Sequence, residues 1–300
     1  MADNVKTPSI YVPKTLGDLI ADKGKNPSLV IFAGGTYIMS RPGIYPEGTG
    51  NDIISIMGIP ELQKVTHTDR FIEVGAAVTL DQLLNTGSFL FSKDTFAAIE
   101  NIGTSVIRSR ATVGGSLCTQ DMRFFLSVIL TTIGAQAEIR LIQKKGFGRV
   151  VTKQNWYPVR KLYSPSGEFL FKDDALLTKI RIPASENSVQ VFRIVGSPMR
   201  KPSETVYFGL SYTPSQNGIV QPNLCIAYPR NGFYNNQDVN SNLSSLSMPA
   251  DNNAIEEQKE ALRQSLEEYC PDITDSQKNR TLRLFTHVLQ DISQQFMTLV

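Results

Sequence analysis

Ser28-Leu-Val-Ile-Phe-Ala-Gly-Gly-Thr-Tyr-Ile38 is the stretch that most constrains the fold, because a short apolar segment typical of a buried strand runs directly into a pair of glycines. A second glycine pair occurs in Ile107-Arg-Ser-Arg-Ala-Thr-Val-Gly-Gly-Ser116, ahead of an apolar segment that predicts a buried helix over residues 120–133. Glycine lets successive backbone N–H groups point in one direction and lets the backbone approach a bulky anion. A helix that starts nearby adds the positive end of its dipole. Two such turns therefore indicate a site that could hold a diphosphate without a cation.

Each glycine pair also has a plainer interpretation as a tight turn. Neither stretch ends in the Lys-Ser or Lys-Thr of a P-loop, and neither has the G-x-G-x-x-G spacing of a dinucleotide-binding loop. A lone Gly-Gly pair is more often a turn than an anion site. Hydrophobic periodicity and residue spacing leave both interpretations open.

The composition is that of a folded protein with roughly two domains. The chain has 300 residues, of which 41% are hydrophobic and 19% charged, so it can bury sizeable cores. Its 30 Lys and Arg residues nearly balance 28 Asp and Glu residues, which disfavours a nucleic-acid-binding protein with a basic face. No apolar run approaches the roughly 18 residues of a membrane-spanning helix, and the first residues lack the apolar segment of a secretion signal. A cytoplasmic protein is therefore expected.

Cysteine and histidine are too scarce for a metal centre built by this chain alone. Cys118, Cys225 and Cys270 are the only cysteines, they lie far apart in the sequence, and there are 2 histidines. These numbers exclude a disulfide framework, a four-cysteine zinc site and a self-contained iron–sulfur cluster. Redox chemistry would need an organic cofactor or a partner's metal. For Cys118, beside the second glycine pair, a small buried residue is a better interpretation than a redox thiol.

The order of elements predicts an α+β protein in two parts. A polar stretch over 184–188 follows a proline and marks the predicted domain boundary. The second part has strands first and helices last, which is typical of helices packed on one antiparallel sheet. The elements predicted before the boundary are a helix capped by Thr15, strands over 28–32, 51–56 and 71–75, helices over 79–84 and 94–101, a hairpin of 137–142 with 149–153, and a strand over 176–182. Those after it are strands over 189–195, 204–213 and 219–228, a polar loop over 231–242, and helices over 255–269 and 275–297.

The two glycine motifs together resemble those of the flavin-binding medium subunit of the molybdenum hydroxylase family, the group of carbon monoxide dehydrogenase and xanthine dehydrogenase. The first motif of that family is Ala-Gly-Gly-Thr-Asp after a strand, and Ala33–Thr36 matches it. The second is Ile-Arg-Asn-x-Ala-Thr-Ile-Gly-Gly-Asn, to which Ile107–Ser116 is similar. Further segments, including Leu177–Pro183 and Val191–Gly196, resemble other parts of the family, so the likeness covers nearly the whole chain.

The resemblance implies a fold and a division of the chain. Residues 1–185 would form a two-part FAD-binding domain of the vanillyl-alcohol-oxidase-like type, with subdomains of about 1–58 and 59–185. Residues 186–300 would form a C-terminal domain like that of carbon monoxide dehydrogenase flavoproteins, with a three-stranded antiparallel sheet and helices.

The resemblance also implies which residues would hold FAD. The first motif would contact the diphosphate and ribityl chain, the second would form the opposite wall, and Ile102 and Gly103 would lie near the adenine. Asp121 takes the place of an aspartate that faces the ribityl chain and flavin, although it could instead only cap the following helix. Arg193 stands where a lysine near the flavin is usual. The implied cofactor residues are Phe32, Ala33, Gly34, Gly35, Thr36, Tyr37, Ile38, Ile102, Gly103, Ile107, Thr112, Gly114, Gly115, Ser116, Asp121 and Arg193.

The function implied by the resemblance is that of an FAD-dependent oxidoreductase subunit in a multisubunit complex. A large molybdopterin-binding subunit would oxidise the substrate, a small subunit with [2Fe–2S] clusters would pass electrons to the flavin, and the flavin would hand them to NAD or another acceptor. No catalytic acid–base residues and no metal are expected in this chain.

Two alternatives stay open beside this function. One is a flavin-free scaffold subunit that kept the fold, which is suggested by Tyr37 at a carboxylate or amide position and by a shortened connection between Gly115 and Asp121. The other is a relative that reduces a cell-wall precursor on the same fold. It is disfavoured because the C-terminal half resembles the hydroxylase group instead.

Overall fold

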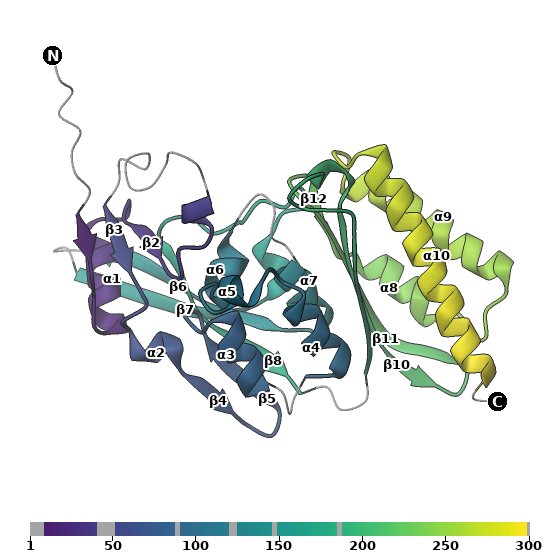
Figure 1. Cartoon of the computed structure of the whole chain (residues 1–300), viewed down its shortest axis with the longest axis horizontal. Helices are drawn as coiled ribbons and strands as arrows, with labels where there is room; N and C mark the ends of the chain where they lie inside the picture. The colour runs from purple at the N-terminus through teal and green to yellow at the C-terminus, as the bar shows by residue number, and fades with distance from the viewer. Residues whose placement is uncertain are drawn as a thin grey trace, which may run out of the picture.

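The computed structural model describes residues 9–40, 52–87, 91–119, 125–145, 149–184 and 188–298. In these residues three sheets follow one another along the chain, with helices beside and between them (Figure 1). The mixed helix-and-sheet class is confirmed. Among the described helices, none combines the length and the apolar character needed to cross a bilayer.

A small parallel sheet leads into the first glycine pair. Helix α1 (Leu16–Lys25) begins at Thr15, whose side chain accepts a hydrogen bond in a capping box, as the sequence predicted. The predicted strand before the glycines is also confirmed, since its last residue is Phe32, directly before Ala33. The strand order of this sheet is β1 (Ile10–Tyr11), β3 (Ile53–Ser55) and β2 (Val30–Phe32).

A five-stranded antiparallel sheet follows, and the predicted hairpin forms two of its strands. Short helix α2 (Pro60–Gln63) precedes it. The strand order is β4 (Val65–His67), β5 (Phe71–Gly75), β8 (Ala175–Pro183), β6 (Gln136–Lys145) and β7 (Arg149–Pro158). Helices lie over one face of this sheet in Figure 1, namely α3 (Leu80–Gly87), α4 (Lys93–Glu100), α5 (Ser105–Arg108), α6 (Val113–Cys118) and α7 (Phe125–Thr132).

The opposite face of this sheet carries a cluster of charged and aromatic side chains. The guanidinium of Arg181 lies 4.2 Å from the ring centre of Phe71 and 4.1 Å from that of Trp156. Its Nη2 atom donates to Glu73 Oε1 over 2.6 Å, and Lys179 Nζ donates to Glu73 Oε2 over 3.4 Å. Burial alone would raise the pKa of Glu73, but the hydrogen bonds and charges of the two bases outweigh it and lower that pKa.

The C-terminal sheet has four strands, so the expectation of three strands is wrong. The additional strand falls in the stretch predicted as a polar loop over 231–242, and helix α8 (Gln237–Ser244) lies in the same stretch. A strand of 3 residues is too short to show alternation in the sequence. Arg230, with a φ of +70°, lies in the turn that brings this strand back onto its neighbour. The strand order is β12 (Gly232–Tyr234), β11 (Gly218–Tyr228), β10 (Val206–Ser215) and β9 (Val189–Val195).

Helix α7 packs against the four-stranded sheet and within the core cluster of the five-stranded sheet, which explains its largely apolar sequence. All 8 of its residues are buried. Phe125 stacks on Tyr207 of β10 with ring centres 5.5 Å apart. A Cβ atom at Gly209 would lie 2.4 Å from Thr132 Oγ1, so glycine there allows the close approach. Helix α7 is the latter part of the helix predicted over 120–133, and residues 120–124 lie outside the described residues.

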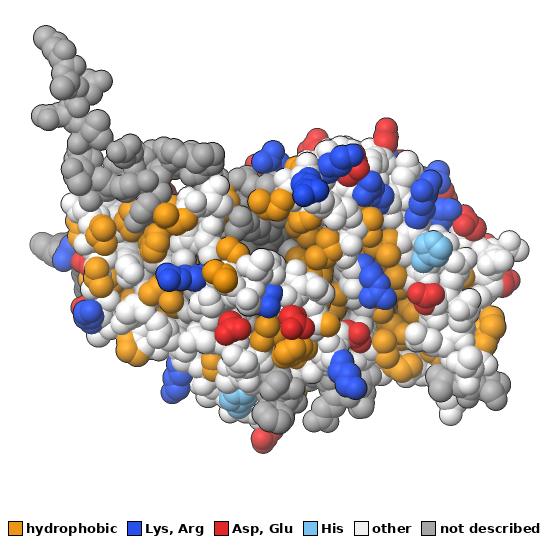
Figure 2. Space-filling model, in the orientation of Figure 1, with side chains coloured by type: hydrophobic (Ala, Val, Ile, Leu, Met, Phe, Trp, Pro, Cys, Tyr) orange, Lys and Arg blue, Asp and Glu red, His pale blue; other side chains and the backbone are white. Residues whose placement is uncertain are grey.

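The other face of the four-stranded sheet packs against the last two helices (Figure 1). These are α9 (Asn252–Tyr269) and α10 (Asp275–Thr298), and both helices were predicted. Leu262, Leu266, Phe285 and Leu289 are buried on their sheet-facing sides. On the face shown in Figure 2, acidic and basic side chains lie among one another over these helices. This mixture accords with the near balance of charges in the sequence.

A candidate cofactor site between two glycine motifs

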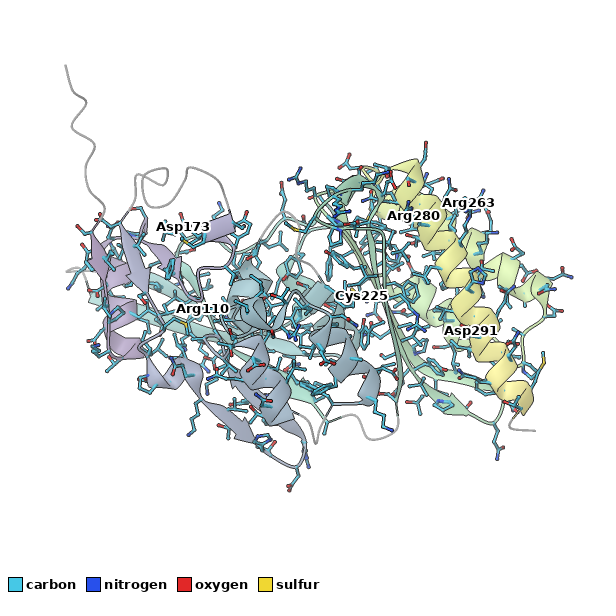
Figure 3. The ribbon with its side chains drawn as sticks, viewed as in Figure 1. Arg110, Asp173, Cys225, Arg263, Arg280 and Asp291 are labelled. Atoms are coloured by element: carbon cyan, nitrogen blue, oxygen red, sulfur yellow. The ribbon has the colours of Figure 1, made fainter. Side chains whose placement is uncertain are left out.

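The structure brings the two glycine motifs into contact. A Cβ atom at Gly34 would lie 1.6 Å from the carbonyl oxygen of Arg110, a residue labelled in Figure 3. A Cβ atom at Gly115 would lie 3.9 Å from that of Ala33. Only glycine at position 34 permits this approach, because any side chain would overlap the Arg110 backbone. Two segments that are far apart in the sequence therefore share one location.

The first motif forms a turn with unused hydrogen-bond donors. Gly35 has a φ of +71°, and the ring of Phe32 fills the space beside it. The Gly35 carbonyl accepts from Met39 in the short helix η1 (Ile38–Ser40). Within the part of the chain that the structure describes, the N–H groups of Gly34, Gly35 and Thr36 donate to no other group. Successive N–H groups of this kind suit an anion with several oxygens.

The second motif differs from the expected turn, because its glycines lie inside helix α6. Thr112 caps this helix and accepts from the Gly115 N–H over 3.0 Å and, through its carbonyl, from the Ser116 N–H over 2.9 Å. The Gly114 N–H donates to the carbonyl of Ala76 over 2.9 Å, and a Cβ at Gly114 would lie 2.7 Å from the Ala76 Cβ. The expectation of a second set of free N–H groups is therefore wrong. The groups that this motif could present to a ligand are its closely packed backbone and the half-buried hydroxyl of Ser116.

The loop between α4 and α5 lies next to this contact. A Cβ at Gly103 would lie 3.1 Å from Ile107 Cγ2, so the loop packs against α5. The Nη1 atom of Arg108 donates to the carbonyls of Glu100 and Gly103, which fixes the loop from the other side. Ile102 is half-buried at the start of this loop. Since Arg110 follows α5 directly, Ile102, Gly103 and Ile107 lie on the segment that leads into the Gly34 contact.

Four other residues singled out in the sequence have different outcomes. Tyr37 is half-buried and follows the first turn, with its carbonyl accepting from Ser40 Oγ over 2.7 Å. Arg193 is exposed on β9 and donates to the Phe192 carbonyl, and among the described residues no contact joins it to either glycine motif. Asp121 lies outside the described residues. Cys118 lies at the end of α6 with exposed residue surface, while burial of its thiol raises its pKa to about 12, which disfavours a redox thiol as the sequence predicted.

One residue beside the site has no signal in the sequence. Tyr163 follows the short helix η3 (Val159–Leu162) and is buried. Its hydroxyl donates to the Leu117 carbonyl of α6 over 2.6 Å and lies 2.7 Å from Ser127 Oγ of α7. Burial is the main reason that the pKa of Tyr163 is raised, so the hydroxyl stays protonated and able to donate. A single tyrosine after a helix predicts core packing, and neither bond can be read from residue spacing.

The described residues around the glycine motifs hold no group of side chains that could bind a metal ion. Over residues 9–40, 52–87, 91–119, 125–145, 149–184 and 188–298, no group of three or more His, Cys, Asp or Glu side chains could hold a metal ion. The chemistry that these residues offer is binding by backbone N–H groups, by hydroxyls and by shape.

Comparison with known sequences gives a family match over the first part of the chain. The family described as "FAD binding domain in molybdopterin dehydrogenase" matches residues 4–185. Aldehyde oxidase 4 of Mus musculus is 30% identical over 46% of this chain and 11% of its own length. Aldehyde oxidase 4 of Arabidopsis thaliana is 26% identical over 60% of this chain and 14% of its own length. The chain therefore spans only a small part of these relatives.

Comparison with solved structures shows the same fold over almost the whole chain. Carbon monoxide dehydrogenase from Hydrogenophaga pseudoflava matches with a TM-score of 0.74 and 14% identity, covering 95% of this chain and 95% of the matched chain. Quinoline 2-oxidoreductase from Pseudomonas putida 86 matches with a TM-score of 0.74 and 15% identity, covering 97% of each chain. At such low identities the likeness concerns the fold.

Proposed function

This chain belongs to the family of FAD-binding domains of molybdopterin dehydrogenases, and we propose that it holds one FAD on its first glycine turn as the electron-transfer subunit of a larger oxidoreductase. FAD is the cofactor of this family, and the chain is accordingly an FAD-dependent oxidoreductase subunit. The residues that grip the cofactor, the route of the electrons and the partners are parts of the proposal.

The observation that carries the proposal is the set of unused donors in the first turn. The N–H groups of Gly34, Gly35 and Thr36 have no acceptor among the described residues, although they lie in a half-buried turn. A diphosphate supplies several acceptor oxygens and needs no basic side chain when backbone N–H groups face it. The Thr36 hydroxyl adds a further donor. These features fit the diphosphate of FAD.

We assign the second motif a different task from the first. Its N–H groups are bound by Thr112 and Ala76, so Gly114 and Gly115 act by leaving room and Ser116 by its hydroxyl. The loop with Ile102 and Gly103, fixed by Arg108, is assigned to the adenine end. Asp121 and Arg193 are retained as family-based candidates near the flavin, and the binding argument does not depend on them.

The chemistry is that of the cofactor, and the chain supplies binding and orientation. When bound, the isoalloxazine of FAD can accept and release electrons singly or in pairs. The chain has 3 cysteines, which is fewer than the four ligands of a [2Fe–2S] cluster, so a cluster that feeds electrons to the flavin would have to be held outside this sequence. We propose a large molybdopterin-binding subunit and a small [2Fe–2S] subunit as partners, with NAD or another acceptor receiving the electrons.

Purification of the full chain tests this function directly. The expected preparation is yellow, shows flavin absorption bands and releases FAD on denaturation. If the preparation is colourless, calorimetric titration of the chain with FAD is expected to show binding with one site. A colourless chain that also fails to bind added FAD would contradict the proposal and favour the flavin-free scaffold, for which the occupied N–H groups of Gly114, Gly115 and Ser116 are the supporting observation.

A further inference from the structure

The hydroxyl of Tyr163 links α6, which contains the second glycine motif, to α7, the next helix along the chain. Leu117, whose carbonyl accepts from Tyr163 over 2.6 Å, lies in the last turn of α6. Ser127, whose Oγ atom lies 2.7 Å from the same hydroxyl, belongs to the buried helix α7. Carbonyls in the last turn of a helix accept no hydrogen bond from within that helix, so a side chain that donates to one of them fixes the helix end.

The ring of Tyr163 is held in place by two further aromatic side chains. Its ring packs against that of Phe233 in β12, with centres 4.8 Å apart, and against Phe169 at 6.0 Å. The backbone of the following loop is held too, since the Pro165 carbonyl accepts from the Phe233 N–H over 2.9 Å. Tyr163 therefore links β12 of the C-terminal sheet, through its ring, to the end of α6, through its hydroxyl.

The position of α6 matters because the gap between the motifs is narrow. Gly115 of α6 faces Ala33 of the first turn, with 3.9 Å between the Ala33 Cβ and the place of a Cβ at Gly115. A small displacement of α6 would change the distance between the free N–H groups of the first turn and the Ser116 hydroxyl. Affinity for a ligand that contacts both sides falls when its two sets of partners are no longer held in place.

We propose that Tyr163 is a positioning residue of the cofactor site, which fixes α6 relative to α7 and so sets the affinity for FAD. The proposal rests on the proposed function, because it concerns the same site. It assigns a role to a residue outside both glycine motifs, and it gives the C-terminal sheet an indirect part in cofactor binding.

Matched substitutions in the full chain test this role. Tyr163→Phe removes the hydroxyl that binds Leu117 and Ser127, and Tyr234→Phe removes a comparable buried hydroxyl, which donates to Ser265 over 2.8 Å in the C-terminal core. Each chain is first freed of flavin and then titrated with FAD in a calorimeter. Relative to the unsubstituted chain, the dissociation constant is expected to be about tenfold higher for Tyr163→Phe and unchanged within about twofold for Tyr234→Phe. The melting temperatures of the two variants without FAD are expected to fall by similar amounts. The visible absorption bands of bound flavin are expected to change shape only in Tyr163→Phe.

The smaller pair Ser127→Ala and Ser265→Ala covers the case in which Tyr163→Phe does not fold. Ser127→Ala is expected to raise the dissociation constant for FAD about threefold, because one of the two bonds to Tyr163 remains, and Ser265→Ala is expected to leave it unchanged. Equal affinities within each pair, or equal losses, would overturn the positioning role while leaving the proposed function intact. Failure of the unsubstituted chain to bind FAD would instead overturn the proposed function.

Discussion

The backbone carbonyl of Arg110 occupies the space that a side chain at Gly34 would need, since a Cβ atom there would lie 1.6 Å from the oxygen. The glycine of the first motif is therefore required by the fold itself, before any ligand is considered. The same residue also carries one of the free N–H groups of the turn. Packing and binding thus depend on the same position.

Substitution of Gly34 by alanine should accordingly damage both properties. We expect Gly34→Ala to lower the free energy of unfolding by about 2 kcal/mol, because the methyl group forces the two motifs apart. FAD binding is expected to be lost in calorimetric titration. Gly17→Ala is the control, because a Cβ there meets only Thr15 Oγ1 at 3.6 Å and the position is an exposed one in α1. That variant should be neutral or more stable by up to about 1 kcal/mol. A Gly34→Ala chain as stable as the control would contradict the contact.

The hydroxyl of Thr36 should contribute to binding without contributing to folding. It has no hydrogen bond within the described part of the chain, so Thr36→Val removes no contact of the protein with itself. We expect the dissociation constant for FAD to rise about fivefold and the free energy of unfolding to change by less than about 0.5 kcal/mol. Titration and chemical unfolding of the two chains measure these quantities. An unchanged affinity would mean that the diphosphate does not lie on this side of the turn.

Glu73 should make the chain sensitive to acid. Its pKa is lowered in the folded chain by hydrogen bonds from Arg181 and Lys179, which outweigh the effect of burial. A carboxyl with a lowered folded pKa stabilises the protein above its unfolded pKa, and this stabilisation is lost as the pH falls through the folded pKa. The unfolding free energy of the unsubstituted chain is therefore expected to decline more steeply below the ordinary carboxyl pKa of 4.5 than that of Glu73→Gln.

The control for this experiment is Glu256→Gln, which removes an exposed ion pair with Lys259 on α9. Exposed pairs of this kind contribute little to stability. Denaturant unfolding of the three chains between neutral and acidic pH should give parallel curves for the unsubstituted chain and Glu256→Gln. A Glu73→Gln curve parallel to both of them would show that the cluster with Arg181 does not govern the acid response.

Thiol labelling should distinguish Cys118 from the other two cysteines. Cys118 is exposed, whereas Cys225 and Cys270 are buried. Burial raises the pKa of Cys118 and of Cys270 to about 12 and that of Cys225 well above its ordinary value, so the three thiols differ in their access to a reagent more than in their thiolate fraction. Mass spectrometry after alkylation of the folded chain at alkaline pH is expected to find one modified cysteine, at position 118, and three after denaturation. Rapid labelling of Cys225, which Figure 3 places in the C-terminal sheet, would contradict the packing described.

The sequence could predict that the two glycine motifs meet better than it could predict the hydrogen bonds within them. The strand that ends at Phe32 and the glycines after it follow local rules, and their pairing with the second motif follows from the family resemblance. The hydrogen bond of the Gly114 N–H could not be predicted from the sequence, because its acceptor is the carbonyl of Ala76, many residues away. The short helix α6 was missed for a related reason, since 6 residues with two glycines have little helix preference and are held by Thr112 and by packing.

In the C-terminal part, the long helices were predicted and the short elements were not. The apolar stripes of α9 and α10 repeat over many turns, which makes their pattern unambiguous. Strand β12 contributes Phe233 and Tyr234 to the core, yet its 3 residues carry no period. Tyr163 shows the same limit at the level of a single side chain, because its two partners come together only in the folded chain.

Helix α7 contacts β10 and β11 of the C-terminal sheet, and its apolar side chains belong to the same core cluster as those of the five-stranded sheet. Cutting the chain at the end of the family match, near residue 185, would remove these two strands and expose a helix whose 8 residues are all buried in the full chain. A minimal flavin carrier made in that way would aggregate. We therefore expect the two parts of the chain to depend on each other for solubility, although the polar stretch over 184–188 predicts a domain boundary between them.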